Sequence, residues 1–265
     1  MTYFRPTIAV LIFLGNSLLA QTNTAPLPPL DGVIQRALER AAVEDDNDRE
    51  FNRNYHYERI RLTEYRNGKG ELKKHEEKRA PGGVNMTNSA PVVAPAPAVA
   101  PAPAEKDDAP VSETHSRIHG RMLAVKDYSL SNLVSRFQFT LIGRDTVNGR
   151  SALVLDFQPA GKKLPVNSYK DNFINKAAGR VWVDEADYAI AKADLHLMQQ
   201  VNVLGGLVGA VWKFTYSFER ERTPEGLWFS RHVDWHLEGR EVIFNRIVDY
   251  HEQKIGTQKV SPPSR

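Results

Sequence analysis

The sequence predicts a mainly β fold with a few helices (α+β), built around one large curved antiparallel sheet. Three observations lead to this prediction. Apolar and polar residues alternate with period two over several segments after His119, as they do in strands that bury one face. Turn-forming residues separate these segments, at Asn148-Gly149, Pro224-Glu225-Gly226 and Glu238-Gly239. Stretches with helical spacing are short, so the few helices are available to cover the sheet.

The first twenty residues have the layout of a cleavable secretory signal. A basic start at Arg5 precedes an apolar run from Ile8 to Leu19, and the small residue Ala20 precedes polar Gln21. The run is too short for a comfortable transmembrane helix, which needs roughly 20 residues, although a retained N-terminal anchor is the alternative interpretation. We therefore expect a periplasmic or extracellular protein that is soluble after cleavage of residues 1–20.

Composition limits the possible functions of the mature chain. The formal charge of +3 falls to +2 when the signal, with its single arginine, is removed. This near balance gives no support to nucleic-acid binding. The chain has no cysteine, which excludes disulfides, thiol catalysis and lipidation on an N-terminal cysteine. With 41% hydrophobic residues, the composition is that of a globular protein.

Residues 21–79 are predicted to form an N-terminal helix and the first hairpin of the β domain. Asp31 is a candidate N-cap, and apolar residues at three- and four-residue spacing continue to Ala41. We expect this amphipathic helix to end in the acidic stretch 44–48. From Asn54 on, tyrosines and aliphatic residues lead to Asn67-Gly68 and then to a charged run, which predicts a hairpin.

A Pro/Ala-rich segment at residues 80–114 interrupts the β domain. Such a composition favours extended conformations and buries little, so we expect a disordered insertion, either an inert spacer or a tether for a partner. The main antiparallel β domain is predicted at 115–253 and a disordered tail at 254–265. We also expect short helices around 129–136 and 168–177 to interrupt the domain.

The clearest alternating segments supply apolar residues to one face of each strand. They are Phe137, Phe139 and Leu141; Leu153, Leu155 and Phe157; Trp212, Phe214, Tyr216 and Phe218; Leu227, Phe229, Val233, Trp235 and Leu237; and Val242, Phe244, Val248 and Tyr250.

One part of the chain resembles a known family. Gly143-Arg144 and Val147-Asn148-Gly149-Arg150 lead into Leu153–Pro159, and Gly179-Arg180-Val181-Trp182-Val183-Asp184 follows. This succession resembles the periplasmic lipoprotein-carrier superfamily of LolA, LolB and outer membrane lipoprotein-sorting proteins. The resemblance implies an open (incomplete) β-barrel whose concave face, covered by helices, shields acyl chains from water. The Pro/Ala-rich insertion and the extra length depart from that family.

A lipid or lipidated protein segment is the partner that this resemblance implies, and apolar side chains of the strands are the candidate ligand-binding residues. They are Phe139, Leu155, Trp212, Phe214, Tyr216, Phe229 and Trp235. A sealed core built from the same residues is the competing interpretation. The mixed-charge run from Arg66 to Arg79 is typical of a solvated hairpin that is able to contact anionic membrane surfaces peripherally.

No catalytic, metal or cofactor site stands out. His232, Asp234 and His236 share one strand face, but a zinc site needs a further ligand, and an exposed polar face is the simpler account. Asp184, Glu185 and Asp187 fall between two strands and are interpreted as turn residues rather than as an acid-base pair. Three functions stay open: a lipid or lipoprotein carrier, a non-enzymatic envelope interaction or sensor module, and, least favoured, an envelope hydrolase. We expect no enzyme and no cofactor.

Overall fold

The computed structural model describes residues 25–84, 134–161, 164–166, 169–203, 209–241 and 243–260. The predicted signal, most of the predicted insertion, the start of the helix expected at 129–136 and the last five residues lie outside these ranges.

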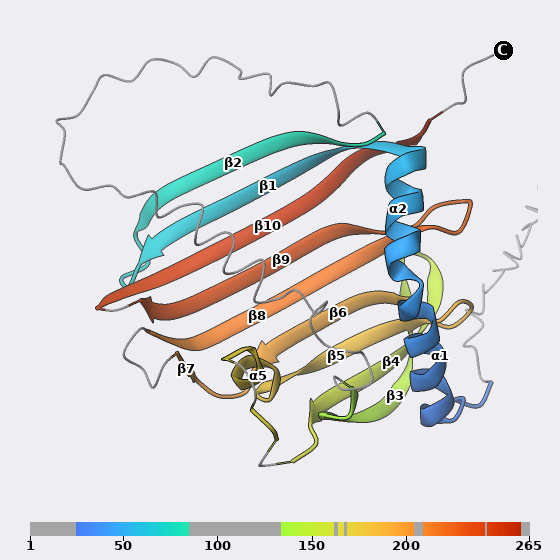
Figure 1. Ribbon diagram of the computed structural model, residues 1–265, viewed down its shortest axis with the longest axis horizontal. Helices are drawn as coiled ribbons and strands as arrows, with labels where there is room; N and C mark the ends of the chain where they lie inside the picture. The colour runs from blue at the N-terminus through green and yellow to red at the C-terminus, as the bar shows by residue number, and fades with distance from the viewer. Residues whose placement is uncertain are drawn as a thin grey trace, which may run out of the picture.

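One ten-stranded antiparallel sheet dominates the fold (Figure 1). Its strand order is β2-β1-β10-β9-β8-β6-β5-β4-β3, with β7 beside β8. Because β2 and β3 end this order and do not pair with each other, the sheet is open. The predicted fold class, mainly β with a large open antiparallel sheet and a few helices, is confirmed. The strands are β1 (Tyr55–Asn67), β2 (Leu72–Gly83), β3 (Phe137–Val147), β4 (Arg150–Pro159), β5 (Ala177–Asp184), β6 (Ile190–Leu197), β7 (Val201–Val203), β8 (Gly209–Arg222), β9 (Trp228–Glu241) and β10 (Phe244–Lys259).

The first hairpin and the last strand join the two ends of the chain. β1 pairs along its length with β10, from Tyr55 opposite Lys259 to Asn67 opposite Arg246. β10 therefore includes residues 254–259, which were predicted to belong to the tail, and β2 includes residues 80–83, which were predicted to begin the insertion. Pro81 is tolerated in β2 because this strand lies at the edge of the sheet.

Two helices precede β1 and lie one after the other across one end of the strands (Figure 1). α1 (Leu30–Ala42) buries Val33 against Leu153, Leu155 and Val183 of β4 and β5. Full burial of an aliphatic side chain of this size stabilises the fold by about 1.5–3 kcal/mol. The predicted capping role of Asp31 is wrong, because Pro29 is the N-cap and Asp31 lies within the first turn.

The acidic stretch begins a second helix, which the sequence interpretation missed. α2 (Glu44–Asn54) carries Glu44, Asp45 and Asp46 in its first turn, where carboxylates interact favourably with the helix dipole. Phe51 of this helix is 1% exposed and stacks on Phe229 of β9 at 4.7 Å between ring centroids. The polar residues 44–48 were interpreted as the end of the first helix, although negative charges favour the start of a helix.

The third helix, α5 (Tyr169–Ile174), falls within the stretch predicted at 168–177. Its Phe173 packs against the cluster of Val211, Phe214 and Leu237. Buried Asp171 forms an ion pair with Arg136 at 3.0 Å, which fixes the helix to the residue before β3.

Candidate binding surfaces on the two faces of the sheet

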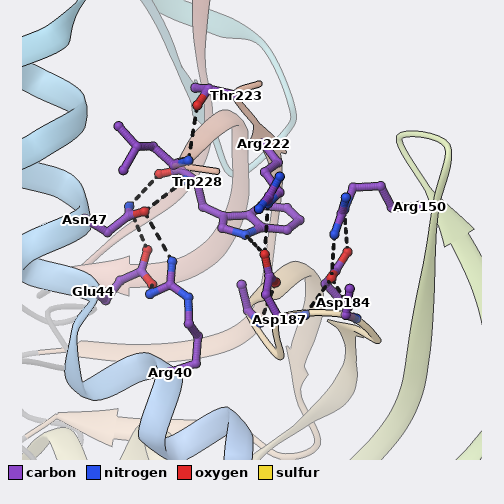
Figure 2. A network of polar contacts seen from close by, with 12 residues as sticks. Arg40, Glu44, Asn47, Arg150, Asp184, Asp187, Arg222, Thr223 and Trp228 are labelled. Atoms are coloured by element: carbon purple, nitrogen blue, oxygen red, sulfur yellow. Dashed lines mark hydrogen bonds and ion pairs between the residues drawn. The ribbon is translucent and has the colours of Figure 1, made fainter. Parts of the chain in front are cut away.

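A network of polar contacts fixes α2 to the sheet (Figure 2). The side chain of Asn47 donates to the carbonyl of Trp228 at 2.7 Å and accepts from the N–H of Trp228 at 2.9 Å. The indole N–H of Trp228 donates to Asp187 at 3.0 Å, and Arg222 donates to the same carboxylate oxygen at 2.9 Å. Trp228 is 2% exposed, so the network lies around a buried aromatic ring.

The turn between β5 and β6 is built around Asp184. This carboxylate accepts from Arg150 at 2.6 Å and 2.8 Å and from the backbone N–H groups of Ala186 and Asp187. Burial raises the pKa of Asp184, but these hydrogen bonds outweigh burial and leave the pKa below its usual value. The interpretation of Asp184 and Asp187 as turn residues is confirmed, and both are occupied by structural contacts.

A hollow of about 250 Å³ lies between the two helices and the sheet. Ala37 and Ala41 of α1 form part of its apolar lining together with Ile190, Tyr216 and Phe218. Small side chains on the helix leave room between the helix and the aromatic rings of β8. Its remaining lining residues are Arg40, Glu44, Asp48, Tyr188, Ala189, Arg220 and Ser230.

Charged groups line the α2 side of this hollow. Glu44 lies between Arg40, at 3.2 Å, and Arg220, with which it also forms an ion pair. Burial, and then the neighbouring Arg40, lower the pKa of Arg220 to about 10. Burial also raises the pKa of Tyr216 to about 12, so this phenol stays neutral. The hollow is therefore amphipathic: apolar side chains line one part of it, and two arginines and two acids line the other.

The structure distributes the seven predicted binding residues over separate places. Tyr216 is the one that lines the hollow beneath the helices. Phe139 and Leu155 pack with Val33 of α1, Phe214 packs with Val211 and Leu237, and Phe229 stacks on Phe51. Trp235 stacks on Tyr250 at 5.2 Å, whereas Trp212 is 40% exposed and does not line this hollow.

A larger hollow, of about 860 Å³, lies on the opposite face of the sheet. Leu153 and Leu155 of β4 point toward α1. Because side chains alternate along a strand, Val154 and Asp156 point to the opposite face. Asp156 is opposite Arg180, and Arg180 is opposite Asp194 on the next strand. Polar and charged residues also line it, among them Gln138, Thr140, Gln158, His196, Thr215, Ser217, Asp234, His236, Asp249 and His251. Apolar and aromatic residues complete the lining, namely Phe157, Trp182, Leu195 and two predicted binding residues, Tyr216 and Trp235.

Histidine and aspartate pair across β9 and β10 on this polar face. His236 Nδ1 lies 2.6 Å from Asp249, and His251 Nδ1 lies 2.6 Å from Asp234. The second ring nitrogen of His236 contacts Glu238 at 3.0 Å, so carboxylates occupy both nitrogens and neither is available to take a proton from a nucleophile. Within the described ranges, no three His, Asp or Glu side chains lie close enough together to hold a metal ion.

Some residues around the hollow under the helices were not predicted. Ala37 and Ala41 were assigned only to the apolar side of a helix, and Arg220 was not singled out at all. Periodicity shows which side of a helix is apolar, but it does not show where a small residue leaves space. Of the helices in the described part of the chain, none is long and apolar enough to span a membrane.

Neither a family model nor a curated protein matches this chain. Solved structures do match it. A LolA superfamily protein from Nitrosomonas europaea is 8% identical, with 89% of this chain and 96% of that chain covered and a TM-score of 0.33. An outer membrane lipoprotein-sorting protein domain from Vibrio parahaemolyticus is 11% identical, with 88% and 95% covered and a TM-score of 0.33.

A DUF1329 family protein from Desulfovibrio piger is 14% identical, with 90% of this chain and 96% of that chain covered and a TM-score of 0.35. These structures include the superfamily that the sequence motifs resemble, and the likeness concerns the fold alone.

Proposed function

We propose that this protein is an exported, non-enzymatic binding protein that shields an acyl chain of a lipid or lipidated protein segment on the helix-covered face of its sheet. The observation that carries the proposal is the hollow of about 250 Å³ between α1, α2 and β8, with Ala37, Ala41 and Phe218 in its lining. Each CH₂ group buried there contributes about 0.8 kcal/mol, so binding needs no directional contact along the chain.

The size of the hollow limits what it accommodates. Small-molecule pockets usually measure about 300–1,000 Å³, so this hollow fits the end of one acyl chain rather than a whole lipid. The rest of the chain would continue along the aromatic side chains next to Tyr216. Trp235 is opposite Tyr216 in the register of β8 and β9, and Tyr250 is opposite Trp235 on β10.

Filling the hollow tests this function. Ala41 lines the hollow, whereas its neighbour Ala42 is exposed, so Ala41→Trp and Ala42→Trp form a matched pair. Native mass spectrometry with lipid extraction should find acyl lipid on the unmodified protein purified from its envelope fraction and on Ala42→Trp, and much less on Ala41→Trp. An unmodified, folded protein that carries no acyl lipid and takes up none from added monoacyl lipid would exclude this function.

A second candidate function rests on the polar hollow of about 860 Å³. A hollow whose lining includes carboxylates, histidines and amides fits a polypeptide segment better than an acyl chain. In this case the protein would be an envelope interaction module. Photo-crosslinking from Thr140, which lines the polar hollow, would test for a bound polypeptide segment. Crosslinking from Glu77, on the edge strand β2, is the control.

A further inference from the structure

Two cations face each other across neighbouring strands near α2 without ion-pair partners. Arg59 of β1 is opposite Lys254 of β10 in the strand register. In the described part of the chain neither side chain has a carboxylate within ion-pair distance, and the Nε atom of Arg59 is buried without a hydrogen-bond partner. Like charges directly opposite each other destabilise a sheet, and a buried donor without an acceptor adds to that cost.

Both cations lie on the helix-covered face. The ammonium of Lys254 lies 5.0 Å from the ring centre of Tyr57 and 5.4 Å from that of Phe51, which belongs to α2. Aromatic faces thus hold the ammonium in place of a carboxylate. Burial lowers the pKa of Lys254, and nearby Arg59 and Arg220 act in the same direction. Arg220 and Ser230 line the hollow from β8 and β9, and Lys254 and Arg59 follow on β10 and β1, the next two strands of the sheet.

Two carboxylates in this region are already paired with other cations. Glu252 accepts from Arg61 at 2.7 Å and from the hydroxyl of Tyr250 at 2.7 Å. Glu44 is shared by Arg40 and Arg220. Asp48 lies beyond ion-pair distance of Lys254; it and Glu252 raise the pKa of Lys254, but burial outweighs them and the pKa stays below its usual value. The helix-covered face therefore carries an excess of positive charge at the α2 side of the hollow.

We infer that Arg59 and Lys254 form the head-group subsite of the proposed acyl-binding surface and select amphiphiles with an anionic phosphate or carboxylate head. A phosphate or carboxylate head bound between this guanidinium and this ammonium supplies both the missing counter-charge and an acceptor for Arg59 Nε. The acyl chain enters the hollow, and the anionic head stays at its cationic margin. This inference rests on the function proposed above and adds the class of ligand.

The experiment compares two amphiphiles that share one acyl chain. 1-Myristoyl lysophosphatidic acid and 1-myristoylglycerol differ in the charged head alone, and isothermal titration calorimetry below their micelle concentrations gives an affinity for each. We expect the anionic ligand to bind at least about tenfold more tightly, the size of effect typical of a hydrogen-bonded charge pair. The preference should shrink at high salt, because the site is only partly buried.

Substitutions of the two cations test whether they cause the preference for the anionic ligand. Arg59→Gln combined with Lys254→Gln should abolish the preference for the phosphate head and leave binding of 1-myristoylglycerol unchanged. Lys73→Gln combined with Lys78→Gln removes the same charge from exposed positions of β2 and should keep the preference. Removing two opposed cations relieves their repulsion, which offsets the lost contacts of Lys254 with the rings of Phe51 and Tyr57. A folded double variant is therefore expected, and its thermal unfolding checks this.

The outcomes separate this inference from the proposed function. Equal affinity for the two amphiphiles would overturn the anionic subsite while leaving an acyl-binding protein. Absence of binding to either would overturn both. Inorganic phosphate that binds as tightly as the phosphorylated amphiphile would show a site for free anions and overturn the proposed ligand class.

Discussion

Asn47 of α2 and Trp228 of β9 are joined by two hydrogen bonds through one side-chain amide, which satisfies both the N–H and the C=O of a buried backbone unit (Figure 2). An amide in this position extends the hydrogen bonding at the start of β9 into a helix. This contact fixes α2, which contributes Glu44 and Asp48 to the hollow and Phe51 to the contact with Lys254.

Loss of this amide should destabilise the protein strongly. Asn47→Ala leaves a buried donor and a buried acceptor without partners, at a cost of about 1–3 kcal/mol each. We expect the free energy of unfolding, measured by urea denaturation, to fall by about 2–4 kcal/mol. Gln35→Ala on the exposed side of α1 is the control and should change little. Similar values for the two variants would contradict the proposed anchoring role.

The aromatic stack under α2 gives a second prediction. Phe51 stacks on Phe229 and Tyr55 and is 1% exposed, so Phe51→Ala should cost about 3–5 kcal/mol of unfolding free energy. Phe244→Ala, at a position that is 64% exposed, provides a control of the same chemical change. A loss of less than about 1 kcal/mol at Phe51, where the expected cavity cost is far larger, would mean that α2 is not packed as described.

Acid stability should depend on Asp184. Its folded-state pKa is lowered, so its contribution is fully present above the unfolded-state pKa of about 3.9 and is lost as the pH falls through the folded-state value. We expect Asp184→Asn to destabilise the protein near neutral pH and to flatten the decline of stability below pH of about 4. Urea denaturation across this pH range measures the effect, with Asp31→Asn as the control. A decline of the same slope in Asp184→Asn would be inconsistent with this role.

Close strand pairing at Gly179 gives a fourth prediction. A Cβ at this position would lie 2.1 Å from the carbonyl oxygen of Asp194, so Gly179→Ala forces β5 away from β6. The expected loss is at least about 1–3 kcal/mol, as for an overpacked core. Gly161→Ala, where a Cβ meets nothing within 4 Å, should be neutral. Equal thermal stability of the two variants would show that the strands separate at no cost.

The sequence by itself determined the strands and the class of fold. Period-two alternation in β3, β4, β8 and β9 is a local property, because each strand must bury one face whatever its partners are. The hairpin at Asn67-Gly68 and the turn at Asp184 were also set locally, by residues that favour turns. Charged residues predicted helix boundaries less well. The acids before Phe51 were interpreted as the end of the first helix, although they begin α2.

The tertiary structure alone decided which side chains face a space and which are sealed. Tyr216 belongs to an alternating segment of the sequence, as do Phe139, Phe214 and Phe229. Helices pack against those three phenylalanines but leave a hollow beside Tyr216. Pairing of the first hairpin with the last strand placed Arg59 opposite Lys254, almost two hundred positions apart in the chain. No local pattern encodes such a juxtaposition, because strand order is set by packing of the whole sheet rather than by the residues of any one strand.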